Sequence, residues 1–125
     1  MIVVIAALAA GAIGALARYG ATHLAGMPRR RLPWAVFVVN AVGCAIGGVV
    51  LALADAHVIG ADIRLIVFGG LAGGLTTFST WSTETVQLVM ANRWRTALLS
   101  VGANVVVGVA VVVVADLVTA AIVGA

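Results

Sequence analysis

The stretch from Gly69 to Glu84 is the feature that most constrains the fold of this chain. It lies inside a long apolar segment, yet it carries four glycines, six hydroxyl side chains and one carboxylate. Glycines at this density weaken a helix and let two backbones approach closely. A helix broken at membrane depth leaves backbone groups that lipid cannot satisfy, so protein, water or an ion must do so. We therefore expect this stretch to line a cavity or to hold an ion.

The composition places that apolar segment in a membrane. Of the 125 residues, 64% are hydrophobic and 9% are charged, whereas a typical soluble domain has about 25% charged residues. A membrane-spanning helix needs about 20 mostly apolar residues. We therefore predict an all-α, multi-pass protein of the cell membrane, with one domain covering residues 1–125. Its four spans are expected at about residues 2–19, 34–54, 64–90 and 96–115.

Two of these spans carry further information. The chain is apolar from Ile2 with no basic residue before the run, so we expect a retained first span rather than a cleaved signal peptide. The third span is longer than a straight crossing requires, which fits a helix interrupted between Gly73 and Thr77.

The charged residues lie near the ends of the spans. The net charge is +3 and the seven cations are all arginines, placed where membrane-facing loops need them, which argues against a nucleic-acid partner. We expect the run in the first loop to contact lipid headgroups of the bilayer. At the end of the first span, Arg18 is either an anchor at the interface or faces a polar vestibule. The first and third loops together hold five arginines, which are Arg29, Arg30, Arg31, Arg93 and Arg95. The opposite side has only Arg64, so the first loop is predicted to be cytoplasmic and both termini outside.

Two amides lie inside the predicted spans, Asn40 in the second and Asn104 in the fourth. An amide at that depth needs partners. Asn40 therefore makes an interhelical hydrogen bond or donates to a permeating ion, and the sequence leaves both open. Asn104 and Gly108 are one helical turn apart and so share a face. The single cysteine, Cys44, permits no internal disulfide and is expected to be a small packing residue.

Three groups of residues resemble the Fluc (CrcB) family of small fluoride channels. The first span has Gly11-x-x-Gly14-Ala15-x-x-Arg18-Tyr19, and the second has Asn40-x-x-Gly43 followed by Gly47. The third has Gly73-Gly74-Leu75-Thr76-Thr77-Phe78-Ser79-Thr80 and then Glu84. The resemblance implies an antiparallel, dual-topology dimer of four-span subunits with two fluoride pores. It also implies a structural sodium ion on the dimer axis, held by backbone carbonyls that map here to Gly73 and Thr76.

The resemblance also implies a fluoride path. The family uses the asparagine of the second span, paired aromatics of the third and nearby hydroxyls, which here implies Asn40, Phe78, Thr77 and Thr80. Trp81 stands where the family usually has a second phenylalanine, three residues after Phe78 and so on the same helical face. Its ring edge and N–H suit an anion, and packing in the core is the alternative.

Glu84 and the fourth span complete the expected path. Glu84 is similar to a family acid. Near an anion route it would repel fluoride unless protonated or hydrogen-bonded, so we expect it to gate the path or to position donors, and the alternative is a buried acid satisfied by Ser or Thr. The family commonly has a tyrosine and serines along the fourth span, where this chain has Asn104 and Gly108. The arginine excess on one side favours a single orientation. A homodimer and a heterodimer with an oppositely oriented paralogue therefore both stay open.

We predict a fluoride-specific passive channel that exports fluoride and lowers its toxicity in the cytoplasm. The sequence shows no nucleophile–base pair, metal cluster or cofactor loop, so we do not expect an enzyme. One alternative is a small proton-coupled multidrug exporter, which needs an acid in the middle of the first span, where this chain has none. The other alternative is a structural membrane subunit with no transport role.

Overall fold

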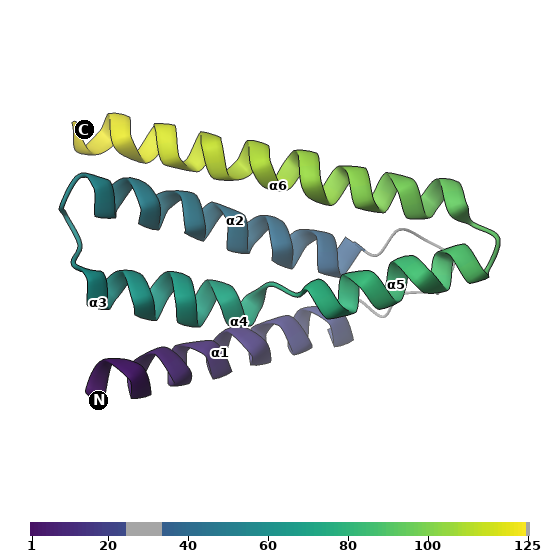
Figure 1. Cartoon of the computed structure of the whole chain (residues 1–125), viewed down its shortest axis with the longest axis horizontal. Coiled ribbons are helices and arrows are strands. Elements are labelled where there is room, and N and C mark those ends of the chain that lie inside the picture. The colour runs from purple at the N-terminus through teal and green to yellow at the C-terminus, as the bar shows by residue number, and fades with distance from the viewer. Residues whose placement is uncertain (25–33, 125) are drawn as a thin grey trace.

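The computed structural model describes residues 1–24 and 34–124, and these residues form helices joined by short turns (Figure 1). Four stretches of helix in this part of the chain are long and apolar enough to cross a membrane. They are α1 (Ile2–Leu24), α2 (Trp34–Asp55), a broken third helix over Ala61–Met90, and α6 (Trp94–Val123). The run Arg29-Arg30-Arg31 lies outside the described residues, as does the loop that carries it.

The four helices run alternately in opposite directions. In Figure 1, α1 and the third helix run one way, and α2 and α6 run the other. The end of α1, the start of α2 and the turn between the third helix and α6 therefore lie at one end, while both termini lie at the other. A chain that crosses the membrane four times must have its two termini on the same side. Which end faces the cytoplasm stays a prediction from the arginines.

The third helix is broken, as the sequence predicted. It begins with α3 (Ala61–Arg64), continues as the π-helical segment η1 (Leu65–Ala72) and ends its first half in α4 (Gly73–Leu75). Thr76 and Thr77 are extended, with ψ angles of 158° and 121°, and α5 (Phe78–Met90) follows. The break is narrower than expected because Gly73 keeps helical angles.

The glycines of the first half serve close packing rather than the break. An ideal Cβ on Gly74 would lie 2.9 Å from the carbonyl carbon of Gly11, and one on Gly70 would lie 3.1 Å from the Cβ of Ala10. The backbones of α1 and of the η1–α4 segment therefore touch. Close approach at small residues is the usual basis of helix association in lipid.

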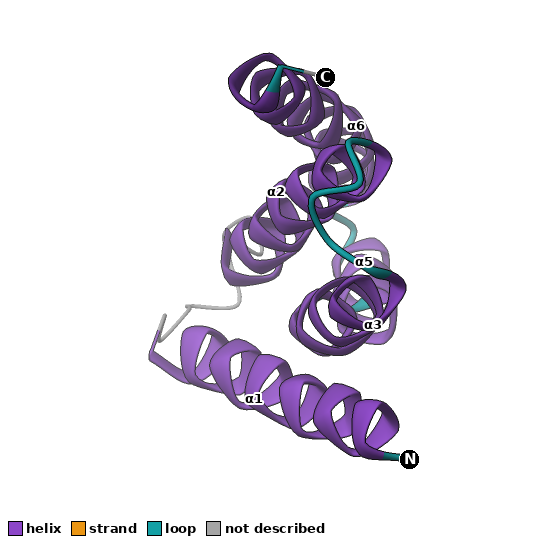
Figure 2. Ribbon diagram, turned by 90° about the vertical axis from the view of Figure 1, so that its left-hand side faces the viewer, coloured by secondary structure: helices purple, strands orange, loops and turns teal. Residues whose placement is uncertain are grey.

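Helices α2 and α6 pack side by side and parallel, in a register that repeats every four residues. Asn40 is hydrogen-bonded to Asn104, and a Cβ on Gly108 would lie 3.4 Å from the Cys44 sulfur. One turn further, Gly48 lies against the backbone of α6 near Asp116. In Figure 2, α6 lies against α2 and away from α1. Cys44 is thus at a helix contact, in agreement with a packing role.

Two helices extend past the predicted spans. α1 continues to Leu24, and α6 continues past Asp116 to Val123, about a turn or two beyond each expected boundary. A single aspartate does not end a helix, whereas Gly124 adopts φ 73°, which favours glycine and terminates α6.

We expect Gly74→Ala to destabilise the protein by about 1–3 kcal/mol, because the added methyl overlaps the α1 backbone at Gly11. Reversible unfolding in detergent measures this loss. Gly102→Ala is the matched control, since no atom of another described segment lies within 4 Å of a Cβ there, and it is expected to be neutral or stabilising by up to about 1 kcal/mol. Equal effects of the two substitutions would show that this contact is not tight.

Candidate functional site

The break in the third helix is stabilised by side chains that replace the missing helical hydrogen bonds. The Thr77 N–H donates to Oδ1 of Asn40 at 3.0 Å. The Thr77 hydroxyl in turn accepts a hydrogen bond from the Thr80 N–H at 3.2 Å and so caps α5. Before the break, both the N–H and the hydroxyl of Thr76 donate to the Ala72 carbonyl at 3.0 Å. The two extended threonines are therefore held in place.

A chain of hydrogen bonds connects the break to α2 and α6, and we call it the amide relay. It consists of the Thr77 N–H, the side-chain amides of Asn40 and Asn104, and the Ser100 carbonyl. The Asn40 Nδ2 donates to Oδ1 of Asn104 at 3.1 Å, and the Asn104 Nδ2 donates to the Ser100 carbonyl at 2.9 Å. Asn40 thus makes the interhelical hydrogen bonds considered from the sequence. Its role toward an ion stays a prediction.

Ser100 is the member of the relay that the sequence reasoning missed. It is 1% exposed, and its hydroxyl has no hydrogen-bond partner in the described part of the chain. The sequence could have indicated this contact, because Ser100 lies four residues before Asn104 and an Asn side chain in a helix can bond to the carbonyl four residues earlier.

Three hydroxyls gather at the start of α5. The Thr77 hydroxyl, on a residue 7% exposed, donates to the Thr80 hydroxyl at 3.0 Å and lies 3.3 Å from that of Ser79. The structure therefore brings the predicted donors Thr77 and Thr80 together, next to the amide relay.

The two aromatic side chains lie on one face of α5, as their spacing predicted. The ring centroids of Phe78 and Trp81 are 5.5 Å apart and the rings are tilted by 59°. Phe78 is 76% exposed and so projects from the subunit. Trp81 is half-buried, and its indole N–H is buried without a partner among the described residues.

One expected environment for Glu84 was a buried acid that a Ser or Thr hydroxyl satisfies. Its Oε2 is buried and has no hydrogen-bond partner in the described ranges, so no Ser or Thr satisfies that oxygen. The Thr85 hydroxyl, on the next residue, donates instead to the Trp81 carbonyl of its own helix at 2.8 Å.

The break diverts the amides that would otherwise pair with two carbonyls. In a continuous helix, the carbonyls of Gly73 and Thr76 would accept from the N–H groups of Thr77 and Thr80. Here those two N–H groups donate to Asn40 and to the Thr77 hydroxyl. Gly73 is exposed and Thr76 is half-buried. Carbonyl oxygens released in this way are suitable ligands for a hard cation.

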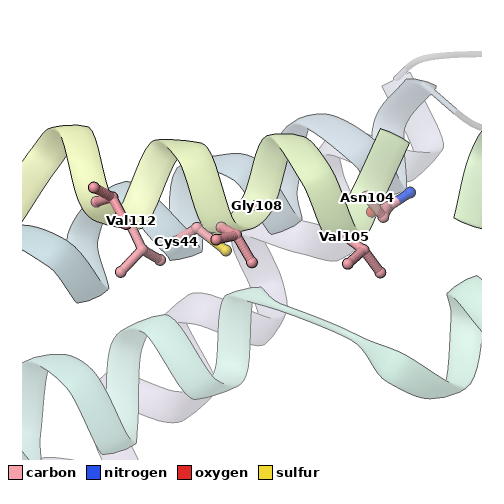
Figure 3. A pocket seen from close by; sticks show the side chains of 7 residues that line it. Cys44, Asn104, Val105, Gly108 and Val112 are labelled. Atoms are coloured by element: carbon pink, nitrogen blue, oxygen red, sulfur yellow. The ribbon is translucent and has the colours of Figure 1, made fainter. Parts of the chain in front are cut away.

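An open, largely apolar groove of about 430 Å³ runs along α6 beside α2 (Figure 3). It is lined by Cys44, Asn104, Val105, Gly108, Val109, Val112 and Val113. Asn104 therefore belongs both to the amide relay and to this groove. Arg18 is half-buried on α1, and no described hydrogen bond joins its side chain to the relay.

The fold and the site define a four-span α-helical membrane protein whose third helix is broken around a polar network. A family described as "CrcB-like protein, Camphor Resistance (CrcB)" matches residues 5–116. The chain belongs to this family, which makes it a multi-pass membrane protein, a class that bacteria place in the plasma membrane.

Curated relatives cover most of the chain. The fluoride-specific ion channel FluC 1 of Thermobifida fusca is 40% identical over 100 residues, which are 78% of this chain and 79% of the relative. The fluoride-specific ion channel FluC of Salinibacter ruber is 38% identical over 82% of this chain and 77% of its own length. The FluC of Saccharophagus degradans is 37% identical over 87% and 83%.

A double-mutant cycle tests the contact between the two amides. Asn40→Ala and Asn104→Ala are expected to show a coupling free energy of about 0.6–1.7 kcal/mol in unfolding, the range found for hydrogen bonds between membrane helices. The cycle of Asn40→Ala with Thr119→Val is the control, because the Thr119 hydroxyl bonds to Ala115 of its own helix. Zero coupling between the asparagines would contradict the relay.

Proposed function

We propose that this protein is a fluoride-specific passive ion channel that exports fluoride and lowers its toxicity in the cytoplasm. The observation that carries the proposal is the polar network at the helix break, in a chain whose relatives are named fluoride-specific ion channels. A passive channel performs no covalent chemistry, so the protein is not an enzyme. The multidrug exporter is not favoured, because α1 contains no acidic residue.

The proposed fluoride path follows the side chains around the break. Fluoride is small and strongly hydrated, so a pore must replace its water with compact donors without holding the ion too tightly. The network supplies such donors from the Asn40 and Asn104 amides and from the hydroxyls of Thr77 and Thr80. The positive ring edges of the aromatic pair, the exposed Phe78 and the half-buried Trp81, extend the path.

Two charged side chains are assigned supporting roles. Glu84 lies one helical turn after Thr80, and its buried Oε2 has no partner among the described residues, so it positions donors beside the path or gates it. We propose that Arg18, near the end of α1, either anchors the helix or faces a vestibule, where a cation attracts anions to the path.

We propose that a structural sodium ion binds the carbonyls of Gly73 and Thr76. These two carbonyls are available to the ion because the N–H groups of Thr77 and Thr80, which would pair with them in a helix, are bonded to side chains. When bound, the cation raises the local potential for anions. The chain's own contribution is to keep the two carbonyls out of a helical hydrogen bond.

A second subunit is proposed to cover the break. Gly73 is exposed and Phe78 is 76% exposed, so a single subunit would present released backbone groups to lipid. Lipid does not satisfy such groups, whereas an antiparallel partner does. The partner is a second copy of this chain or an oppositely oriented paralogue.

Expressed alone and reconstituted in liposomes, the protein is expected to release fluoride but not chloride. Asn40→Ala and Phe78→Ile are expected to lower the fluoride efflux by about tenfold or more, because each removes a favourable contact to the ion. Efflux measured with a fluoride electrode checks this, and Thr85→Val, whose hydroxyl bonds within α5, is the matched control. Undiminished efflux in both pore variants would overturn the proposed path. Efflux that requires a co-expressed paralogue would establish the heterodimer.

Sodium is expected to raise the melting temperature of the purified dimer relative to N-methyl-glucamine at equal ionic strength, since a ligand that binds only the folded state stabilises it. Asn40→Leu is expected to reduce this shift, because the Thr77 N–H is then free to pair with the Gly73 carbonyl. Thr85→Val serves again as the control. A melting temperature independent of sodium would refute the cation site.

A further inference from the structure

The two ends of the helices differ in their aromatic residues. The end that holds the turn between α5 and α6 also holds the last part of α1 and the start of α2 (Figure 1). Tyr19, Trp34 and Trp94 lie at this end, and each is more than half exposed. They are the chain's one tyrosine and two of its three tryptophans. Such amphipathic rings lie at the level of the lipid headgroups, which places the start of α6 there.

The arginines at the start of α6 have no nearby acid of their own chain. Three of the chain's four acids lie toward the opposite end and one lies within α5; they are Asp55, Asp62, Asp116 and Glu84. Neither residues 91–115 nor residues 25–33, which form the loop at the same end, include an acid. In the described part of the chain, no hydrogen bond joins Arg93 or Arg95 to a carboxylate.

Arg93 is half-buried immediately before α6 and has few partners. Its Nη2 lies 3.5 Å from the Thr96 hydroxyl, and its Nη1 is buried with no hydrogen-bond partner among the described residues. The Arg95 guanidinium lies over the Trp94 ring, 5.3 Å from the centroid. A charge that is partly withdrawn from water needs an anionic partner. A planar guanidinium binds an oxyanion through paired hydrogen bonds at one edge.

The first turn of α6 supports the two guanidinium groups. It contains no acid, and the side chain of the capping residue, Arg93, makes no capping hydrogen bond. The first N–H groups of a helix have no carbonyl of their own helix to pair with, and the positive end of the helix dipole lies beside them. Guanidinium groups next to such N–H groups are the donors that phosphate sites typically provide.

We propose that Arg93 and Arg95, with the first turn of α6, bind the phosphate of an anionic lipid headgroup. The phosphate approaches the open edge of the Arg93 guanidinium, and Arg95, held over Trp94, supplies a second positive charge. A zwitterionic headgroup suits this place less well, because the arginines repel its ammonium group. The competing explanation is a pair of solvated arginines without a particular ligand.

Thermal unfolding of the purified protein in detergent measures this binding. The probes are phosphatidylglycerol, which is anionic, phosphatidylcholine, which is zwitterionic, and inorganic phosphate at the same concentration. Arg93→Gln keeps a polar side chain and removes the charge, whereas Arg93→Lys keeps the charge without the planar fork. Arg95→Gln, at an exposed position, provides a second test if Arg93→Gln does not fold. Arg64→Gln is the matched control, because Arg64 is exposed and lies near the opposite end.

We expect phosphatidylglycerol to raise the melting temperature of the parent protein, and the other two probes to raise it little. Arg93→Gln is expected to raise the lipid concentration that gives half of the shift by about tenfold or more, because charge-assisted hydrogen bonds are lost. Arg95→Gln is expected to raise it as well, by a smaller factor. Arg93→Lys is expected to recover part of the loss, and Arg64→Gln to keep the parental response.

Three results would overturn the inference. Equal shifts with the two lipids would show that the headgroup charge is not recognised. A parental response in both Arg93→Gln and Arg95→Gln would place the anionic lipid elsewhere on the protein. A shift that inorganic phosphate reproduces at the same concentration would indicate a site for a free anion. Fluoride efflux enters none of these measurements, so a failure of the proposed channel function would leave the lipid site standing.

Discussion

The structure depends on how backbone groups are satisfied where a membrane helix is broken. Lipid cannot pair the N–H groups of Thr77 and Thr80 where the helix is broken, so a side-chain amide and a hydroxyl do so. The Asn40 amide comes from another helix, and the Thr77 hydroxyl comes from the break itself. The polar network is therefore first a requirement of the fold. The use for ions that we propose is built on groups that the fold had to supply.

The two halves of the third helix have different neighbours, and this difference explains where the break lies. The η1–α4 half packs on α1 through glycines that bring the backbones into contact. The α5 half packs on α6, which is itself paired with α2. The amide relay joins these two packing units at their boundary, at residues 76 and 77. A break one turn earlier would disturb the contact between Gly74 and α1.

The same break leaves hydrogen-bonding groups of two kinds, carbonyl acceptors and amide donors. Diverting the Thr77 and Thr80 amides releases the carbonyls of Gly73 and Thr76, which are acceptors. Each relay amide accepts one hydrogen bond and donates one, which leaves one hydrogen of each amide nitrogen as a donor. The cation site and the anion path that we propose therefore both use groups that a single interruption provides. Neither requires a charged side chain at the point of contact.

The sequence by itself determined the class of protein, the number of spans and the break in the third helix. These follow from local properties: apolar length, the density of glycines and hydroxyls, and the spacing of Phe78 and Trp81 along one helix. It also identified Asn40 and Asn104 as amides that need partners, but it could not say that they are partners of each other. Only the parallel register of α2 and α6 decides that contact, because residues 64 positions apart meet through packing. The tertiary structure likewise decided that Gly73 stays helical, that Ser100 anchors the relay and that one Glu84 oxygen has no partner in the part of the chain that the structure describes. Each depends on which neighbouring helix reaches the residue, and periodicity within one helix carries no information about that.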